Sequence, residues 1–259
     1  MSRPASSSPT GSVTLVPRPT QGRVFTAERR VRLGDVDTSG CLRLDACARY
    51  LQDVARDDAA DSAIENPLGW VVRRTVVHVV RPPAFQELVR LETWCSGVGS
   101  RWAERRTTIV GEHGGLVEAA SVWVHLDLET GRPLRLGPSF HERYAASAGG
   151  RSADARLRHD PEVPPGADVR HWAWRATDFD VLGHVNNAAC GAVVEEGVAA
   201  GSDGADRAGL LAELEYRDPA LPGCPATLAT TTEGDAARIW LLAGERLCFT
   251  ARVWREPAR

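Results

Sequence analysis

Asp180 and His184, a carboxylate and an imidazole four residues apart, are the residues best suited to carry chemistry. A carboxylate can act as a general base toward water or attack a carbonyl carbon directly. An imidazole can orient the substrate or the water, or donate a hydrogen bond to a developing oxyanion. A candidate helix begins just after the pair, and its unpaired N–H groups would stabilise the same oxyanion. The pair is therefore a candidate site for hydrolysis at an activated carbonyl group.

The same residues also fit a surface turn without chemistry. In that interpretation Asp178 and Asp180 accept hydrogen bonds from nearby backbone, Gly183 supplies a positive φ, and His184 is merely exposed. The asparagines that follow, Asn186 and Asn187, are residue types that either contact a substrate or oxyanion or cap the start of a helix. Both interpretations of the loop stay open at this point.

This loop is one of two copies of a sequence repeat. Residues 35–43 and 178–186 share the pattern D-x-D-x-x-G-x-[LV]-x. Each copy follows a candidate strand, at 29–33 and 170–176, and each precedes a candidate helix. Self-similarity with matching flanks predicts two related structural units in one chain.

The first copy lacks the residues that make the second one promising. Cys41 stands at the position of the histidine, and Arg43 at the position of the first asparagine. A pair of Cys41 with Asp37 has no base to form a thiolate. We therefore interpret the first loop as a degenerate copy, in which Asp35 and Gly40 have structural roles.

The hydrophobic pattern predicts the same elements after each loop. Apolar residues at helical spacing predict a helix over 44–62, and an Ala-rich stretch predicts another over 187–200. Four strands are predicted after each helix, the last two of each set joined by a glycine-containing hairpin turn. These strands cover residues 70–80, 88–97, 101–111, 116–126, 210–217, 226–232, 238–243 and 246–254.

Five strands and one long helix per unit predict an α+β fold in which a curved antiparallel sheet wraps around one central helix. This is a hotdog-like unit, and two of them form a tandem hotdog, an intramolecular pseudo-dimer. We predict a disordered tail at 1–24, a first hotdog at 25–138 with the degenerate site, a linker at 139–168 and a second hotdog at 169–259 with the catalytic loop. A homodimer of the whole chain is left open.

Composition excludes several function classes. The chain has 259 residues, of which 43% are hydrophobic, and a net charge of −3. All of its basic residues are arginine. This balance argues against wholesale binding of nucleic acid or an anionic membrane, and no apolar window is long enough for a membrane span. Residues 1–22 lack the apolar region of a secretory signal, so a cytoplasmic location is expected.

The cysteines predict neither a metal site nor a disulfide framework. None forms a C-x-x-C pair, and no histidine lies at zinc-site spacing from them. We expect Cys190 to be a core residue and Cys224 to be a thiol in a turn. No metal or other cofactor is predicted. The six cysteines are Cys41, Cys47, Cys95, Cys190, Cys224 and Cys248.

Four stretches of the chain together resemble the acyl-ACP thioesterases. They are the loop at 178–187, the segments 91–97 and 122–133, and the Leu-Glu-Tyr-Arg run at 214–217. The resemblance covers roughly residues 25–255. It implies a double hotdog that releases free fatty acid from acyl carrier protein, with the carboxylate and imidazole of the loop as catalytic groups and no cofactor.

The chain departs from the plant members of that family at three positions. Leu182 replaces an asparagine of the loop, and Pro219 and Ala220 replace a Glu-Cys pair. The predicted function is hydrolysis of fatty acyl-ACP. An acyl-CoA thioesterase is the first alternative, and a non-catalytic acyl-binding hotdog, suggested by these three departures, is the second.

Several arginines, histidines and tryptophans could have functional roles, but their positions on predicted strands also explain them. The pairs Arg73-Arg74 and Arg105-Arg106 would help to dock an acidic carrier protein, or they lie on solvated strand faces. His78 and His125 are expected in the core or at a sheet edge. The eight tryptophans are expected in sheet packing, with one or two lining an acyl tunnel. They are Trp70, Trp94, Trp102, Trp123, Trp172, Trp174, Trp240 and Trp254.

Overall fold

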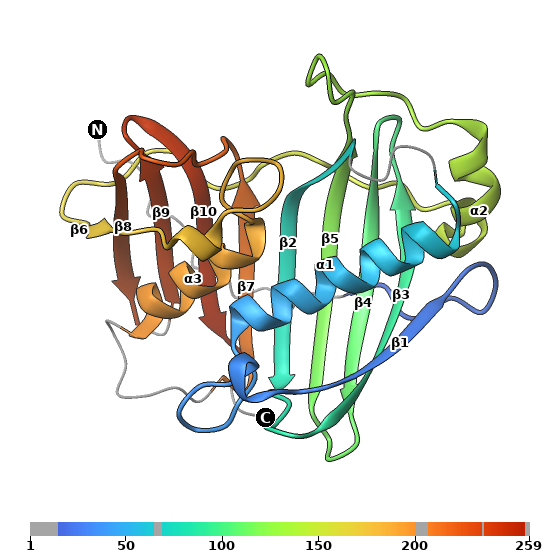
Figure 1. Ribbon diagram of the computed structural model, residues 1–259, viewed down its shortest axis with the longest axis horizontal. Coiled ribbons are helices and arrows are strands. Elements are labelled where there is room, and N and C mark those ends of the chain that lie inside the picture. Colours follow the sequence, from blue (N-terminus) through green and yellow to red (C-terminus); the bar gives the residue numbers. More distant parts are fainter. Residues whose placement is uncertain (1–14, 65–68, 200–206, 235, 257–259) are drawn as a thin grey trace, which may run out of the picture.

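The structure is a computed structural model that describes residues 15–64, 69–199, 207–234 and 236–256. In this part of the chain, two units of like construction lie side by side in one sheet (Figure 1). Among its helices, none combines the length and the apolar character that crossing a membrane would require.

The first unit consists of five strands and one long helix, in the predicted order. Its strands lie in the sheet order β1-β3-β4-β5-β2, all neighbours antiparallel. Its elements are β1 (Phe25–Arg30), α1 (Leu44–Asp61), β2 (Trp70–Arg81), β3 (Leu88–Val98), β4 (Trp102–Gly111) and β5 (Leu116–His125).

The second unit repeats this construction with a shorter helix. Its strands lie in the order β7-β10-β9-β8-β6. A short 3-10 turn at Asn187–Ala189 leads into the helix. The elements are β6 (Asp168–Trp172), α3 (Cys190–Ala199), β7 (Leu210–Tyr216), β8 (Ala226–Glu233), β9 (Ala236–Ala243) and β10 (Arg246–Arg255).

The two central strands, β2 and β7, pair antiparallel and join both units into one ten-stranded sheet. Helices α1 and α3 lie against the same face of this sheet (Figure 1). They meet at Gly191, where a Cβ atom would lie 2.5 Å from the backbone nitrogen of Asp45. Only a glycine permits this close approach. The predicted repeat, with one helix and five strands in each copy, is confirmed.

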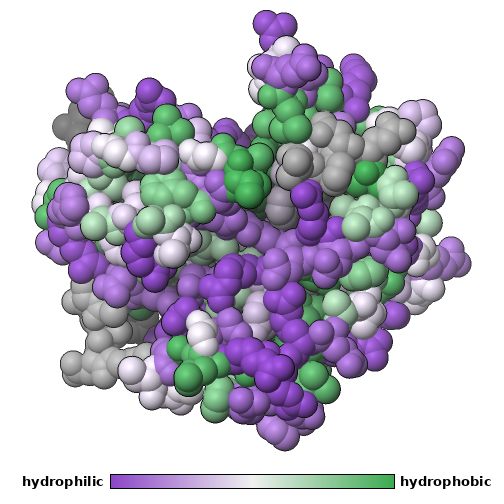
Figure 2. All heavy atoms as spheres, viewed as in Figure 1, coloured by the Kyte–Doolittle hydropathy of each residue, from purple (hydrophilic) through white to green (hydrophobic). Residues whose placement is uncertain are grey.

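The core lies between the helices and the sheet. Cys47, Tyr50, Leu51 and Val54 are buried on one face of α1, at the spacing of the helical turn. The other face of α1 is hydrophilic, and Figure 2 shows it crossing the middle of the molecule. The helix therefore covers the sheet with its apolar face, as its sequence pattern predicts.

The predicted linker contains a helix that composition did not reveal. Helix α2 (Pro138–Ala148) begins with proline in its first turn and ends at Gly149, whose φ is 55°. Phe140 and Tyr144, one turn apart, are buried against β3 and β4. The helix forms because it buries this aromatic pair, so this part of the segment is a structural element of the first unit. The domain bounds themselves stay a prediction.

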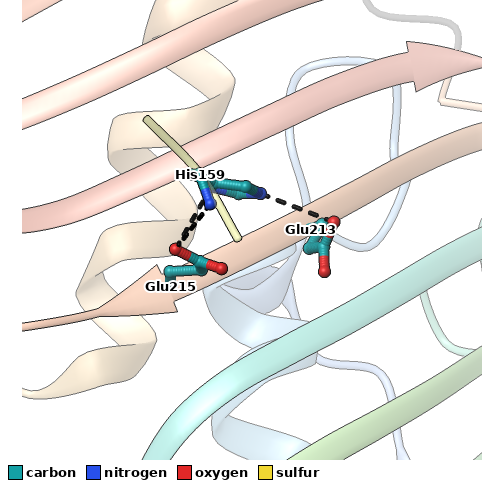
Figure 3. A group of neighbouring side chains, drawn as sticks. All are labelled: His159, Glu213 and Glu215. Atoms are coloured by element: carbon teal, nitrogen blue, oxygen red, sulfur yellow. Dashed lines mark hydrogen bonds and ion pairs between the residues drawn. The ribbon is translucent and has the colours of Figure 1, made fainter. Parts of the chain in front are cut away.

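Residues 151–160, which we call the strap, cross the sheet on the face opposite to the helices. Leu214 of β7 belongs to the core on the helix side, and the alternation of the strand places Glu213 and Glu215 on the other face. Glu215 accepts hydrogen bonds from the backbone N–H groups of Arg158 and His159, the latter at 3.1 Å. Figure 3 shows the His159 ring beside both glutamates. A buried carboxylate thus holds the connection between the two units.

Part of the predicted disordered tail is also held against the sheet. Arg106 Nε donates to the carbonyl of Val16 at 2.9 Å, and Arg23 Nε donates to Asp58 Oδ1 at 2.6 Å. The prediction of disorder is therefore wrong for residues 15–24, because backbone and side chains there satisfy buried charged groups. Residues 1–14 lie outside the described residues.

Candidate active site

The loop of the second repeat is a tight turn built on two aspartates. The carboxylate of Asp178 accepts from the backbone N–H of Arg175 at 2.8 Å and so closes the turn that precedes the loop. Asp180 Oδ1 accepts from the N–H of Leu182 at 2.9 Å, and Gly183 has a φ of 78°. These are the features expected of an Asx turn. They fix the loop backbone and leave the side chain of His184 to be placed by its neighbours.

The second oxygen of the Asp180 carboxylate is held by an asparagine. Asn186 Nδ2 donates to Asp180 Oδ2 at 3.1 Å. The Nδ1 atom of His184 lies 3.9 Å from Asp180 Oδ1 and 3.3 Å from the carbonyl oxygen of Val185. With Nδ1 directed at that carbonyl, Nε2 is left for a substrate or a water molecule. The predicted pair therefore lies together, with the carboxylate oriented by a neighbouring side chain.

The two asparagines have different environments. Asn186 caps the helix start, because its Oδ1 accepts from the N–H of Ala188 at 2.8 Å. Asn187 lines a cavity, and the structure gives its backbone and side-chain N–H groups no acceptor within the described ranges. Capping, which the sequence left as an alternative, applies to Asn186. Asn187 has free donors at a helix start, where an anion is stabilised.

A cavity of about 330 Å³ lies between α1 and the sheet of the first unit. The loop of the second unit closes one end of it, through Asp180, Val181, Leu182 and His184. The walls come from α1, β2 to β5 and α2, and they are largely apolar and aromatic. Wall residues include Ala55, Ala59, Ile64, Trp70, Val72, Cys95, Ala103, Trp123, Phe140 and Tyr144.

The loop of the first repeat forms the same kind of turn but does not line the cavity. Asp37 Oδ1 accepts from the N–H groups of Ser39 at 2.9 Å and Cys41 at 3.1 Å. Its other oxygen is paired with Arg207 of the second unit. Partial burial opposes ionisation, yet the hydrogen bonds from Ser39 and Arg207 lower the pKa of Asp37 to about 2. None of the residues 35–43 lines the cavity, so the first carboxylate serves a structural ion pair.

The cysteines are not placed as nucleophiles. Burial raises the pKa of Cys47 to about 12 and that of Cys95 to about 11, and burial also raises the pKa of Cys190. Cys224 is exposed in a turn closed by a hydrogen bond to the carbonyl of Leu221, and it is not among the residues that line the cavity. Cys190 in the core and Cys224 in a turn were both predicted. A thiol with a raised pKa is a poor nucleophile.

We therefore expect thiol alkylation of the native protein to leave the thioester hydrolysis predicted from the sequence essentially unchanged. Iodoacetamide should modify Cys224, the exposed thiol, and mass spectrometry of the modified protein should locate the label. The remaining activity is then measured on the same sample. Inactivation in step with labelling of Cys224 or Cys190 would contradict the assignment of the chemistry to Asp180 and His184.

One arginine of each pair, Arg74 and Arg106, is buried and cannot take part in a docking surface. Arg74 is 6% exposed, and its guanidinium donates to strap carbonyls, including that of Arg156 at 2.9 Å. Arg106 is 1% exposed and donates to backbone carbonyls. Arg105 lines the cavity and pairs with Asp58. Carrier docking and a solvated strand face, the two sequence-based interpretations, are therefore wrong for Arg74 and Arg106, because both side chains are buried against partners far away in the sequence.

Sequence reasoning missed the roles of two residues, of which only Arg105 lines the cavity. Glu215 of the Leu-Glu-Tyr-Arg run accepts hydrogen bonds from the strap on the opposite face of the sheet. A glutamate inside an apolar strand was a signal for a buried partner, since isolated buried charges are rare. Trp70 and Trp123 are the tryptophans that line the cavity, in agreement with the expected one or two.

Comparisons with known proteins agree with this architecture. A sequence model of the acyl-ACP thioesterase N-terminal domain matches residues 22–144. An uncharacterised protein of Mycobacterium tuberculosis is 31% identical over 247 residues, which cover 94% of this chain and 96% of that protein. A chloroplastic acyl-[acyl-carrier-protein] hydrolase of Cuphea viscosissima is 30% identical over 124 residues, 46% of this chain and 30% of that protein.

Solved structures confirm the tandem hotdog fold. The 12:0-ACP thioesterase of Umbellularia californica superposes with a TM-score of 0.73 at 22% identity, over 92% of this chain and 99% of that one. An acyl-ACP thioesterase of Bacteroides thetaiotaomicron gives a TM-score of 0.71 at 17% identity, over 89% and 97%. With the paired units, the loop and the sequence matches together, the chain belongs to the acyl-ACP thioesterase family.

Proposed function

We propose that the protein hydrolyses the thioester of an acyl group carried by acyl carrier protein, with Asp180 and His184 as the catalytic residues. Family membership supports thioester hydrolysis as the reaction class. The observation that carries the assignment to this loop is its position. The Asp180 carboxylate, oriented by Asn186 at 3.1 Å, closes one end of the apolar cavity.

The proposed reaction uses water as the nucleophile. The Asp180 carboxylate accepts a proton from water, and the resulting hydroxide adds to the thioester carbonyl carbon. The carbonyl oxygen becomes an oxyanion, which the free N–H groups of Asn187 and the His184 imidazole stabilise. When the oxyanion collapses, the carbon–sulfur bond breaks, and the departing thiolate receives the proton. Carboxylic acid and free thiol are the products.

Release of free thiol from acyl-ACP by the purified protein tests this proposal directly. A disulfide reagent reports each thiol, after the exposed Cys224 has reacted to completion. Sustained turnover is expected, and binding without turnover would instead support the non-catalytic acyl-binding alternative. A comparison of acyl-ACP with acyl-CoA at low and high salt separates the two carriers, since docking on an acidic carrier protein is weakened by screening.

Leu182→Asn tests whether the site needs a side-chain amide at this position. We expect the change to alter kcat by less than about threefold, because the free N–H groups of Asn187 already offer oxyanion donors at the cavity. A missing oxyanion donor typically costs about 10²–10³ in kcat. Steady-state hydrolysis of one acyl-ACP by both proteins measures the effect. A rise of about tenfold or more would show that the natural protein lacks a donor.

A further inference from the structure

The cavity ends on a buried ionic cluster at the side away from the catalytic loop. In sheet order its walls run from β2 through β5 and β4 to β3, and Phe140 and Tyr144 of helix α2 line it as well. Figure 1 shows α2 at the outer end of this unit. There Arg105 Nη1 lies 2.7 Å from Asp58 Oδ2, and the hydroxyl of Tyr144 donates to the same oxygen at 3.0 Å. Arg105 and Tyr144 line the cavity, with Asp58 behind them at 1% exposure. This end is therefore polar, in contrast to the walls.

The guanidinium of Arg105 is only partly satisfied by protein groups. Its Nη1 has two partners, Asp58 and the hydroxyl of Thr93 at 3.2 Å. Throughout the described ranges, the structure gives Nε and Nη2 no acceptor. The side chain is 17% exposed and borders the cavity. Hydrogen-bond donors thus remain available where the distal end of a bound acyl group would lie.

The surrounding charges leave this end without an excess of negative groups. Asp58 is shared between Arg105 and Arg23, whose Nε lies 2.6 Å away, and Arg23 also pairs with the exposed Asp61. Two arginines and two aspartates therefore balance. A neutral oxygen acceptor fits this cluster, since it satisfies the free donors and adds no charge.

The cavity is also short. Along α1 it extends from Gln52 to Ala59, about two helical turns or ~10 Å. Its volume of about 330 Å³ is at the lower end of the range for ligand cavities. A long saturated chain would exceed this length, and its terminal methyl group would cover guanidinium N–H groups without replacing their hydrogen bonds. Leaving such donors buried and unpaired is unfavourable.

We propose that the acyl group accepted here is short to medium in length and carries a neutral oxygen, a hydroxyl or a keto group, near its distal end, where Arg105 binds it. This inference rests on the proposed thioesterase function for its kinetic test. The role assigned to Arg105 is a contact to the substrate remote from the reacting carbonyl, so it governs the choice of acyl group.

Three pantetheine thioesters test the inference on the full chain: octanoyl, ω-hydroxyoctanoyl and hexadecanoyl. We expect kcat/KM for the hydroxylated chain to exceed that for octanoyl by about tenfold, the size of one hydrogen bond to a charged donor. The hexadecanoyl ester should be the poorest substrate. Equal rates for the two eight-carbon chains, or a preference for hexadecanoyl, would overturn the inference.

Arg105→Met should remove the preference for the hydroxyl group, so that the ratio of kcat/KM for the ω-hydroxyoctanoyl and octanoyl esters falls to about one. Methionine keeps much of the side-chain volume, and Asp58 keeps its ion pair with Arg23. Arg101→Met changes an exposed arginine just before β4 that does not line the cavity; it is the matched control and should retain the preference. If Arg105→Met does not fold, Arg105→Lys replaces it. The lysine keeps the charge beside Asp58 but not the guanidinium geometry, and should weaken the preference.

A binding measurement separates failure of this inference from failure of the proposed function. Calorimetric titration of the natural protein with octanoate and ω-hydroxyoctanoate requires no turnover. If no thioester is hydrolysed but the hydroxylated acid binds more tightly and loses that advantage in Arg105→Met, the proposed catalysis is wrong and the inference about the cavity holds. If thioesters are hydrolysed without such a preference, the proposed catalysis holds and the inference about the cavity is wrong.

Discussion

Asp180→Asn should lower kcat for thioester hydrolysis by at least about 10³-fold in a protein that stays folded. The amide keeps the shape of the carboxylate but cannot accept a proton from water. Its neighbours are the Leu182 N–H at 2.9 Å and the Asn186 amide at 3.1 Å, and the amide oxygen can still accept from one of them. Circular dichroism and the thermal midpoint establish folding, and single-turnover hydrolysis of acyl-ACP measures the chemical step.

The repeat supplies a matched control for this change. Asp37→Asn alters the same position of the same turn in the first unit, where the carboxylate pairs with Arg207 and does not line the cavity. This variant should keep kcat within a few-fold of the natural protein. A loss as large as that of Asp180→Asn would mean that both loops take part in catalysis. A fully active Asp180→Asn protein would show that Asp180 is not the general base.

Glu215→Gln should destabilise the protein by about 3–5 kcal/mol, the usual consequence of removing one partner from a buried charged network. Glu215 is 0% exposed, accepts from the N–H groups of Arg158 and His159, and pairs with Arg217 at 3.1 Å. The amide nitrogen would face donors where an acceptor is needed. At roughly 2–4 °C per kcal/mol for a chain of this size, the thermal midpoint should fall by about 10 °C.

Limited proteolysis provides a second measurement of the same change. The strap should be cut faster in Glu215→Gln, since its backbone loses one of the two acceptor oxygens that hold it to β7. Glu162→Gln, an exposed carboxylate just beyond the strap, is the control and should leave both the midpoint and the cleavage rate unchanged. An unaltered midpoint in Glu215→Gln would show that Arg158 and His159 hold the strap through other contacts.

Most of the fold could be predicted because its signals are local. The helix predicted over 44–62 is Leu44–Asp61, and the eight strands predicted after the loops lie within a few residues of their observed bounds. Helix α2 was missed although Pro138, Gly149 and the aromatic pair one turn apart are helix signals in the sequence. These signals predict a helix only if a neighbouring surface is available to bury the aromatic residues, and the sequence does not show that surface. The Ala- and Gly-rich composition indicated a linker instead.

The site was predictable only in part, because only some of its contacts join residues that are close in sequence. Asp180 and His184 lie close in sequence, so their spacing was visible without a structure. Arg105 and Asp58 meet across the first unit, and Glu215 meets the strap across the sheet. No periodicity reports such pairings, because they depend on how separate elements pack. The exposure of Arg74 and Arg106 was predicted wrongly for this reason.

The cavity walls come from the first unit, whereas the aspartate and histidine come from the second. In a chain built from two units of like construction, this division allows the two halves to diverge under separate selection. Under the proposed function, substitutions between residues 52 and 144 would change which acyl group is accepted while the proposed catalytic residues within 178–187 stay constant. New substrate ranges can therefore arise in one half of the gene without first passing through an inactive intermediate.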